Sequence, residues 1–155
     1  MLKKRFDLFL NKYYLQVVLI FLILLVVDKI IKIRLLECTH CDIIIKNSGF
    51  AFGILSDWNF NTTVAFSSWL VICIYSMYYW SQFTKKWKIV FSGLIFGGLG
   101  NIIDRIRFGH VIDYVPFFGV FTANIADIII TISVLIGILY SQEFIHHINR
   151  HRLHI

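Results

Sequence analysis

Residues 15–32 read LQVVLIFLILLVVDKIIK, an apolar run from Leu15 to Val27 that ends abruptly at Asp28. A run of this kind approaches the ~20 apolar residues that cross a bilayer as a helix. The whole chain shares this character: 58% of its 155 residues are hydrophobic and only 15% are charged, whereas a soluble domain carries about 25% charged residues. The composition therefore indicates an integral membrane protein.

Four such runs predict four transmembrane helices. We expect an all-α integral membrane fold that forms a single domain over residues 1–155, because four spans leave little sequence for a soluble domain. Glycines recur in the third span, so its backbone can approach a neighbouring helix closely. The predicted spans cover residues 13–34, 61–80, 87–103 and 124–140.

Basic residues at the ends of the predicted spans indicate the orientation. They gather before the first span, between the second and third, and after the fourth, and such residues mark the cytoplasmic side. Both termini are therefore predicted to be cytoplasmic. The net charge of +6 is then a signal of topology, and no nucleic-acid partner is expected. The basic residues are Lys3, Lys4, Arg5, Lys12, Lys85, Lys86, Lys88, Arg150 and Arg152.

In this orientation most of the acids lie on the outer side. Asp104 is expected at the end of the third span, Asp127 at the start of the fourth, and Asp113 in the loop between them, so their side chains can meet. Ionisable groups at membrane depth are costly and mark functional sites, although a structural ion pair is the ordinary alternative. Asp28 and Lys32 stand four residues apart on one helix face, which favours such a pair.

Several polar motifs lie in order along the chain: DKIIK at Asp28–Lys32, NSGFAFG at Asn47–Gly53, GGLGNIIDR at Gly97–Arg105 with GHVIDY at Gly109–Tyr114, and NIAD at Asn124–Asp127. They resemble the motifs of lipoprotein signal peptidase, or signal peptidase II. These bacterial membrane aspartyl peptidases remove signal peptides from lipid-modified prolipoproteins. The resemblance covers nearly the whole chain. It departs from the usual pattern at Ala123, where the family usually has an aromatic residue before the last Asn.

The resemblance implies that Asp113 and Asp127 form a catalytic dyad. Two carboxylates a few ångströms apart in a low-dielectric site share one proton, so the chemistry suits such a pair. The ionised member takes a proton from the attacking water, and the protonated member donates to the scissile carbonyl. This mechanism needs no metal or cofactor. From position alone, Asp127 could instead stabilise a helix N-terminus, and Asp113 could be a solvated loop acid.

Further roles follow from the resemblance for the polar residues around the dyad. Some would bind the extended substrate backbone or position the acids, and Asn124 could also cap a helix. Others are expected from their own positions, and not from the resemblance, to support the structure. The residues in the first group are Asn47, Asn101, Arg105 and Asn124, and those in the second are Asp28, Lys32, Gly49 and Asp104.

The loop between the first two spans is predicted to contain a small β-rich extracytoplasmic element. The run Ile43–Ile45 followed by Asn-Ser-Gly is typical of a short strand and a turn. This element would form a cradle over the site. Phe117 and Phe118 lie near the dyad in sequence and could close on a lipidated substrate.

The family's location and partners are also implied by the resemblance. We expect a monomeric, multi-pass protein of the bacterial cytoplasmic membrane, with its active site on the extracytoplasmic side. Its partners would be membrane lipids and a prolipoprotein that is cut just before a diacylglyceryl-modified cysteine. The two acyl chains of that cysteine stay in the bilayer, so the enzyme must work at the membrane surface.

The cysteines leave a second function open. Cys38 and Cys41 form a C-x-x-C motif, which four-helix membrane thiol oxidoreductases also carry. Those proteins pass electrons on through a second pair, whereas only Cys73 remains here. A local disulfide, free thiols or metal binding through His40 would be simpler explanations of the C-x-x-C motif than a redox function. A proton or ion pathway would also use intramembrane acids, but here the acids cluster on one side.

Overall fold

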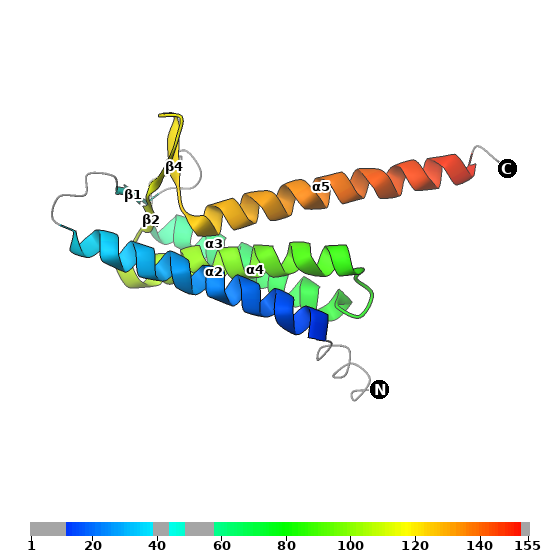
Figure 1. The fold of residues 1–155 in the computed structure, drawn as a ribbon, viewed down its shortest axis with the longest axis horizontal. Coiled ribbons are helices and arrows are strands. Elements are labelled where there is room, and N and C mark those ends of the chain that lie inside the picture. Colours follow the sequence, from blue (N-terminus) through cyan, green and yellow to red (C-terminus); the bar gives the residue numbers. More distant parts are fainter. Residues whose placement is uncertain (1–11, 39–43, 49–57, 153–155) are drawn as a thin grey trace.

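The computed structural model describes residues 12–38, 44–48 and 58–152. This part of the chain is mostly helical, as predicted, with two small antiparallel sheets (Figure 1). The elements in order are α2 (Lys12–Glu37), β1 (Ile45–Asn47), α3 (Trp58–Tyr79), α4 (Lys85–Phe108), β2 (Val111–Asp113), β3 (Val115–Phe117), β4 (Phe121–Ala123) and α5 (Ile125–Arg152).

Three of the described helices are long and apolar enough to cross a membrane. They are the segments Tyr13–Glu37 of α2, Phe60–Tyr79 of α3 and Lys85–Phe108 of α4. The apolar part of α5, Ile125–Ser141, is shorter.

Two helices continue past the predicted ends of their spans. The third span was predicted to end at residue 103 because charged residues begin at Asp104, but α4 runs on to Phe108. The charges do not end the helix because Asp104 is ion-paired inside the protein. The helix α5 likewise continues well beyond residue 140, so Arg150 and Arg152 lie within its last turn and not after it.

The distribution of side chains is the reverse of that in a soluble protein. Large apolar residues on the helices face outward, including Leu19 at 54% exposure and Met77 at 80%. Charged residues lie inside, where Asp28, Lys32 and Asp104 are each 0% exposed. Soluble proteins keep such residues at the surface. An apolar exterior around a polar interior is expected when lipid surrounds the helices.

All the strands lie at one end of the helical bundle (Figure 1). The opposite end of the bundle holds the start of α2, the turn between α3 and α4, and the end of α5. Close to the strands α5 packs on α4, and it diverges from the bundle toward its C-terminal end. Glycines allow the close packing: a Cβ on Gly97 would lie 2.7 Å from Ile130 Cγ1 and 2.8 Å from the Ala126 carbonyl oxygen.

A strand lies in the predicted region after the first helix, at Ile45–Asn47. It pairs with β2, so that Ile45 lies opposite Asp113 and Asn47 opposite Val111. Asp113 was predicted in a loop but ends this strand. Such short strands depend on a partner for their stability, and here that partner comes from the distant α4–α5 connection.

Two glycines of the α4–α5 interface give a matched test of this packing. In Gly97→Ala the added methyl group meets backbone as well as side chain, so we expect the free energy of unfolding to fall by about 1–3 kcal/mol. In Gly137→Ala the nearest atom to the new Cβ is Val90 Cγ1 at 3.4 Å. The gain in helix propensity should then keep stability equal or raise it by up to about 1 kcal/mol. Thermal unfolding in detergent measures both, and equal melting temperatures would contradict the packing described.

Candidate active site

Asp113 is placed by the end of α4 and by the β1–β2 pair. Gly109 ends the helix in the left-handed conformation (φ 78°), and its N–H donates to the Arg105 carbonyl at 2.9 Å. Glycine adopts this conformation without strain, which lets the chain turn from the helix into β2. Asp113 at the end of β2 is buried, and Asn47 Nδ2 on β1 donates to its Oδ2 at 3.0 Å. The strand pairing therefore brings the predicted residues Asn47 and Asp113 together.

Asp127 lies in the first turn of α5 and takes part in its N-terminal cap. The Asp127 N–H donates to Asn124 Oδ1 at 3.0 Å, and the Asn124 N–H donates back to Asp127 Oδ2 at 3.3 Å. This reciprocal pair of hydrogen bonds satisfies backbone N–H groups that have no acceptor within the helix at its N-terminus. Asn101 on α4 donates from Nδ2 to Asp127 Oδ1 at 2.6 Å. The capping role predicted for Asn124 is therefore confirmed.

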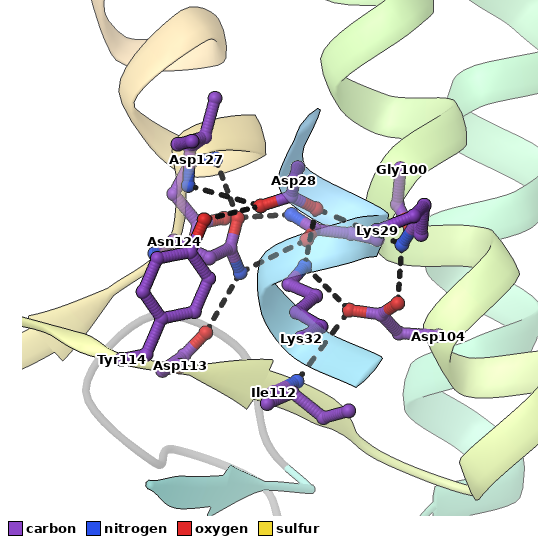
Figure 2. Close-up of polar contacts among 12 residues, drawn as sticks. Asp28, Lys29, Lys32, Gly100, Asp104, Ile112, Asp113, Tyr114, Asn124 and Asp127 are labelled. Carbon is purple, nitrogen blue, oxygen red and sulfur yellow. Dashed lines mark hydrogen bonds and ion pairs between the residues drawn. The ribbon is translucent and has the colours of Figure 1, made fainter. Parts of the chain in front are cut away.

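Asn124 also connects the two acids. Its Nδ2 donates to Asp113 Oδ1 at 2.8 Å and to Asn101 Oδ1 at 3.2 Å. In Figure 2 it lies between Asp113 and Asp127. The Asn124 side chain is completely buried, so these bonds are not exchanged with water. Asn124 thus links carboxyl groups from separate segments of the chain: its side-chain amide donates to Asp113, and its backbone N–H donates to Asp127.

The environment of Asp113 favours its protonated form. Burial raises the pKa of this carboxyl, and the nearby charge of Asp127 raises it further. Hydrogen bonds from Asn47 and Asn124 and the positive charge of Lys32 act in the opposite direction, but the net shift is upward. Asp113 therefore holds a proton at a pH at which an exposed aspartate has lost it.

A cluster of ion pairs lies beside the two acids (Figure 2). Lys32 Nζ is 2.7 Å from Asp28 Oδ2 and 2.6 Å from Asp104 Oδ2. Lys29 pairs with the other oxygen of Asp104, and its Nζ also donates to the Gly100 carbonyl at 2.6 Å. The pair predicted between Asp28 and Lys32 is confirmed, and both lysines that pair with Asp104 come from α2. We call these four side chains, Asp28, Lys29, Lys32 and Asp104, the ion-pair cluster.

The cluster holds the chain on both sides of Asp113. The N–H of Ile112 donates to Asp104 Oδ2 at 3.5 Å, a long bond, and the hydroxyl of Tyr114 donates to Asp28 Oδ1 at 2.9 Å. Each acid of the cluster thus binds one neighbour of Asp113. This arrangement agrees with the supporting role that the sequence predicted for Asp28 and Asp104.

The cluster also holds the start of α5. Asp28 Oδ1 accepts a hydrogen bond from the N–H of Ile125 at 3.2 Å. Ile125 stands between the cap residue Asn124 and Asp127 in the chain. Through Asp28, therefore, α2 is connected to both segments that carry Asp113 and Asp127.

The remaining candidates are placed as follows. Arg105 is buried on α4, and the charges of Asp127, Asp113 and Asp104 act on it. Gly49 lies outside the described residues. Lys29 was not among the site residues predicted from the sequence. A lysine inside an apolar span could have indicated a buried ion pair. The sequence did not identify its partner, because Asp104 lies on another helix.

The cysteine and metal alternatives have less support. Cys38 is disulfide-bonded and Cys73 is free, whereas Cys41 and His40 lie outside the described residues. Within the described ranges, no group of three or more His, Cys, Asp and Glu residues is arranged to hold a metal ion. Cys73 does not supply the second cysteine pair that electron transfer would need.

Comparisons with known proteins agree with the geometry. A family model described as signal peptidase (SPase) II, Peptidase_A8, matches residues 20–143. The lipoprotein signal peptidase of Halothermothrix orenii is 32% identical over 83% of this chain and 97% of its own length. That of Bartonella henselae is 35% identical over 68% of each chain.

Two solved structures of bacterial membrane enzymes share the fold. One has a TM-score of 0.71 at 26% identity and covers 83% of this chain and 88% of its own. The other has a TM-score of 0.66 at 26% identity and covers 81% and 91%. The sequence motifs, the buried acids, the family model and these relatives lead to one assignment, and the chain belongs to the signal peptidase II family of lipoprotein signal peptidases.

Proposed function

We propose that this protein is a membrane aspartyl endopeptidase whose dyad is Asp113 and Asp127. Its family is that of the peptidases that remove signal peptides from prolipoproteins. The finer proposal is that the substrate carries a diacylglyceryl-modified cysteine and is cut just before it. The observation that carries the proposal is the link through Asn124, which joins the buried carboxyl of Asp113 to the half-buried carboxyl of Asp127, on a different segment.

The chemistry follows from one shared proton. The ionised carboxyl removes a proton from a water molecule, whose oxygen attacks the scissile carbonyl carbon. The protonated carboxyl donates to the carbonyl oxygen, which gives a tetrahedral intermediate. Its collapse breaks the C–N bond, and a proton passes to the leaving amine. The dyad then holds one proton again. The raised pKa of Asp113 supports this state, because burial favours the protonated form of that carboxyl.

The buried amides act on the acids themselves. Asn47, Asn101 and Asn124 each donate to a dyad carboxyl. These bonds favour the positioning role of the three residues over direct binding of the substrate backbone. Arg105 interacts electrostatically with Asp113 and Asp127, and it remains a candidate for contact with the substrate.

We further propose that all four described helices span the membrane, with both termini cytoplasmic and the dyad at the outer side. The acids and strands share one end of the bundle (Figure 1). Lysines and aromatic rings share the other, where Lys88 Nζ lies 4.3 Å from the Tyr14 ring and Lys86 Nζ lies 4.1 Å from the Tyr140 ring. Aromatic rings are typical of both membrane interfaces, and the lysines favour the cytoplasmic one.

Removing either dyad carboxyl should stop the reaction. We expect Asp113→Asn and Asp127→Asn to insert and fold but to cleave a diacylglyceryl-modified precursor at least about 10³-fold more slowly, because general acid–base catalysis is lost. Glu37→Gln is the matched control, since Glu37 is exposed and pairs only with nearby Arg34 among the described residues. Its rate should equal that of the wild type. A dyad variant that retains a tenth of the activity would overturn the assignment.

The pH dependence of cleavage should respond to Asn47. The Asn47 amide stabilises the charged form of Asp113, so Asn47→Ala should raise the pKa of Asp113 further. The limb of the kcat/KM profile that reports Asp113 should then move to higher pH, by about one unit. Ser141→Ala, at an exposed position toward the other end of α5, is the control and should leave the profile unchanged. A profile that moves to lower pH in Asn47→Ala would contradict the proposed contact.

The cysteines test the rival function. Because peptide hydrolysis uses no thiol, the double variant Cys38→Ser with Cys41→Ser should keep most of the cleavage activity in the same precursor assay. A thiol oxidoreductase would lose its activity entirely. Loss of cleavage in the folded double variant would therefore favour the redox function.

A further inference from the structure

Charged and titratable groups surround the dyad on several elements, and their balance determines its protonation. Helix α3 and strands β3 and β4 contain no acidic, basic or histidine residue. Helix α5 contributes only Asp127 between Ile125 and Ser141. The groups that face the dyad or its segments are Asp28, Lys29 and Lys32 on α2, Lys46 on β1, Asp104 and Arg105 on α4, and His110 and Tyr114 on either side of β2.

Three of these groups add no buried charge near neutral pH. Burial lowers the pKa of His110, so its imidazole is neutral. Burial and the charge of Asp28 raise the pKa of Tyr114, so its phenol keeps its proton. Lys46 is exposed to solvent, and water screens its charge.

The groups that remain are unequal in number. There are four carboxyls, Asp28, Asp104, Asp113 and Asp127, and three cations, Lys29, Lys32 and Arg105. Asp127 and Lys29 are half-buried, and the other five are buried. With every group ionised, the buried site would carry one net negative charge. An unbalanced charge is strongly disfavoured in a low-dielectric interior, and a titratable group there takes up a proton instead. One bound proton makes the site neutral.

The location of that proton follows from the ion pairs. Asp28 and Asp104 each contact lysine ammonium groups, which stabilise their ionised forms. In the described part of the chain, the ion pairs leave out Asp113 and Asp127. These two acids accept hydrogen bonds from the side-chain amides of Asn47, Asn101 and Asn124 and from the backbone N–H of Asn124. The proton therefore belongs to the dyad.

From this arrangement we infer that Lys32 is a positioning residue for the reacting proton. Together with Lys29 and Arg105, it sets the number of protons on the dyad to one, because one bound proton makes the site neutral. This inference rests on the proposed function only in taking Asp113 and Asp127 as the reacting acids. Lys32 is the central cation because it is completely buried and contacts both acids of the ion-pair cluster. Its charge also acts on Asp113 and Asp127 directly.

Paired substitutions separate this role from a structural one. Lys32→Met removes one positive charge, so the dyad should bind protons more tightly and the kcat/KM profile should move to higher pH by about one unit. Asp28→Asn removes one negative charge, keeps an oxygen that can accept from Tyr114 and Ile125, and should move the profile to lower pH by a similar amount. The double variant restores the balance, and its profile should return to within about 0.3 units of the wild type.

A purely structural role for Lys32 gives a different pattern. All three variants would then lose activity without opposite shifts in pH, and the double variant would be no closer to the wild type than the singles. That pattern would overturn the inference. If Lys32→Met fails to fold, Asp28→Asn and the double variant still carry the test, because only charge balance predicts a downward shift that the second substitution reverses.

A measurement without substrate makes the inference independent of the proposed function. Infrared spectroscopy of the purified protein in detergent detects protonated carboxyls, and subtraction of the Asp113→Asn and Asp127→Asn spectra isolates the dyad. We expect one protonated carboxyl in the wild type near neutral pH and two in Lys32→Met. Equal numbers in the two proteins would refute the role of Lys32. A single proton in a wild-type protein that fails to cleave precursor would refute the proposed function alone.

Discussion

The contact of Lys32 with Asp28 and Asp104 is the interaction on which the rest of the structure depends. All three side chains are completely buried, and removing one partner of such a group leaves an uncompensated charge in the interior. The contact joins α2 to α4. Because the two acids also bind neighbours of Asp113 and the start of α5, the same ion pairs that connect the helices hold the segments that carry Asp113 and Asp127.

This arrangement uses the membrane environment. In lipid the helices present apolar side chains outward, so polar contacts inside the protein supply the specificity of packing. Glycines bring α4 against α5 near the strands, and the buried amides of Asn101 and Asn124 then reach the dyad from both helices. The site is therefore built from the same helix contacts that stabilise the fold.

Much of this could be predicted from the sequence because its signals are local. Apolar runs marked the helices, and the motifs placed the dyad acids and their asparagines. The β1–β2 pairing was not visible, since three-residue strands carry little periodicity and these two lie 66 residues apart at Asn47 and Asp113. The extension of α4 was missed because the partners of Asp104 are on α2. Lys29 was missed because its partner Asp104 also lies on another helix. Its position next to Asp28 gave no help, since one residue turns an α-helix by about 100°.

The central claim is that the two carboxyls of Asp113 and Asp127 act on one water molecule within a neutral, buried site. An experimental structure of the protein in a lipid bilayer, at a resolution that shows ordered water, tests it most directly. The account predicts one water molecule within hydrogen-bonding distance of both carboxyls, with Asn124 bound to each acid beside it. Carboxyls too far apart to share a water molecule, or an Asn124 side chain turned away from them, would contradict it.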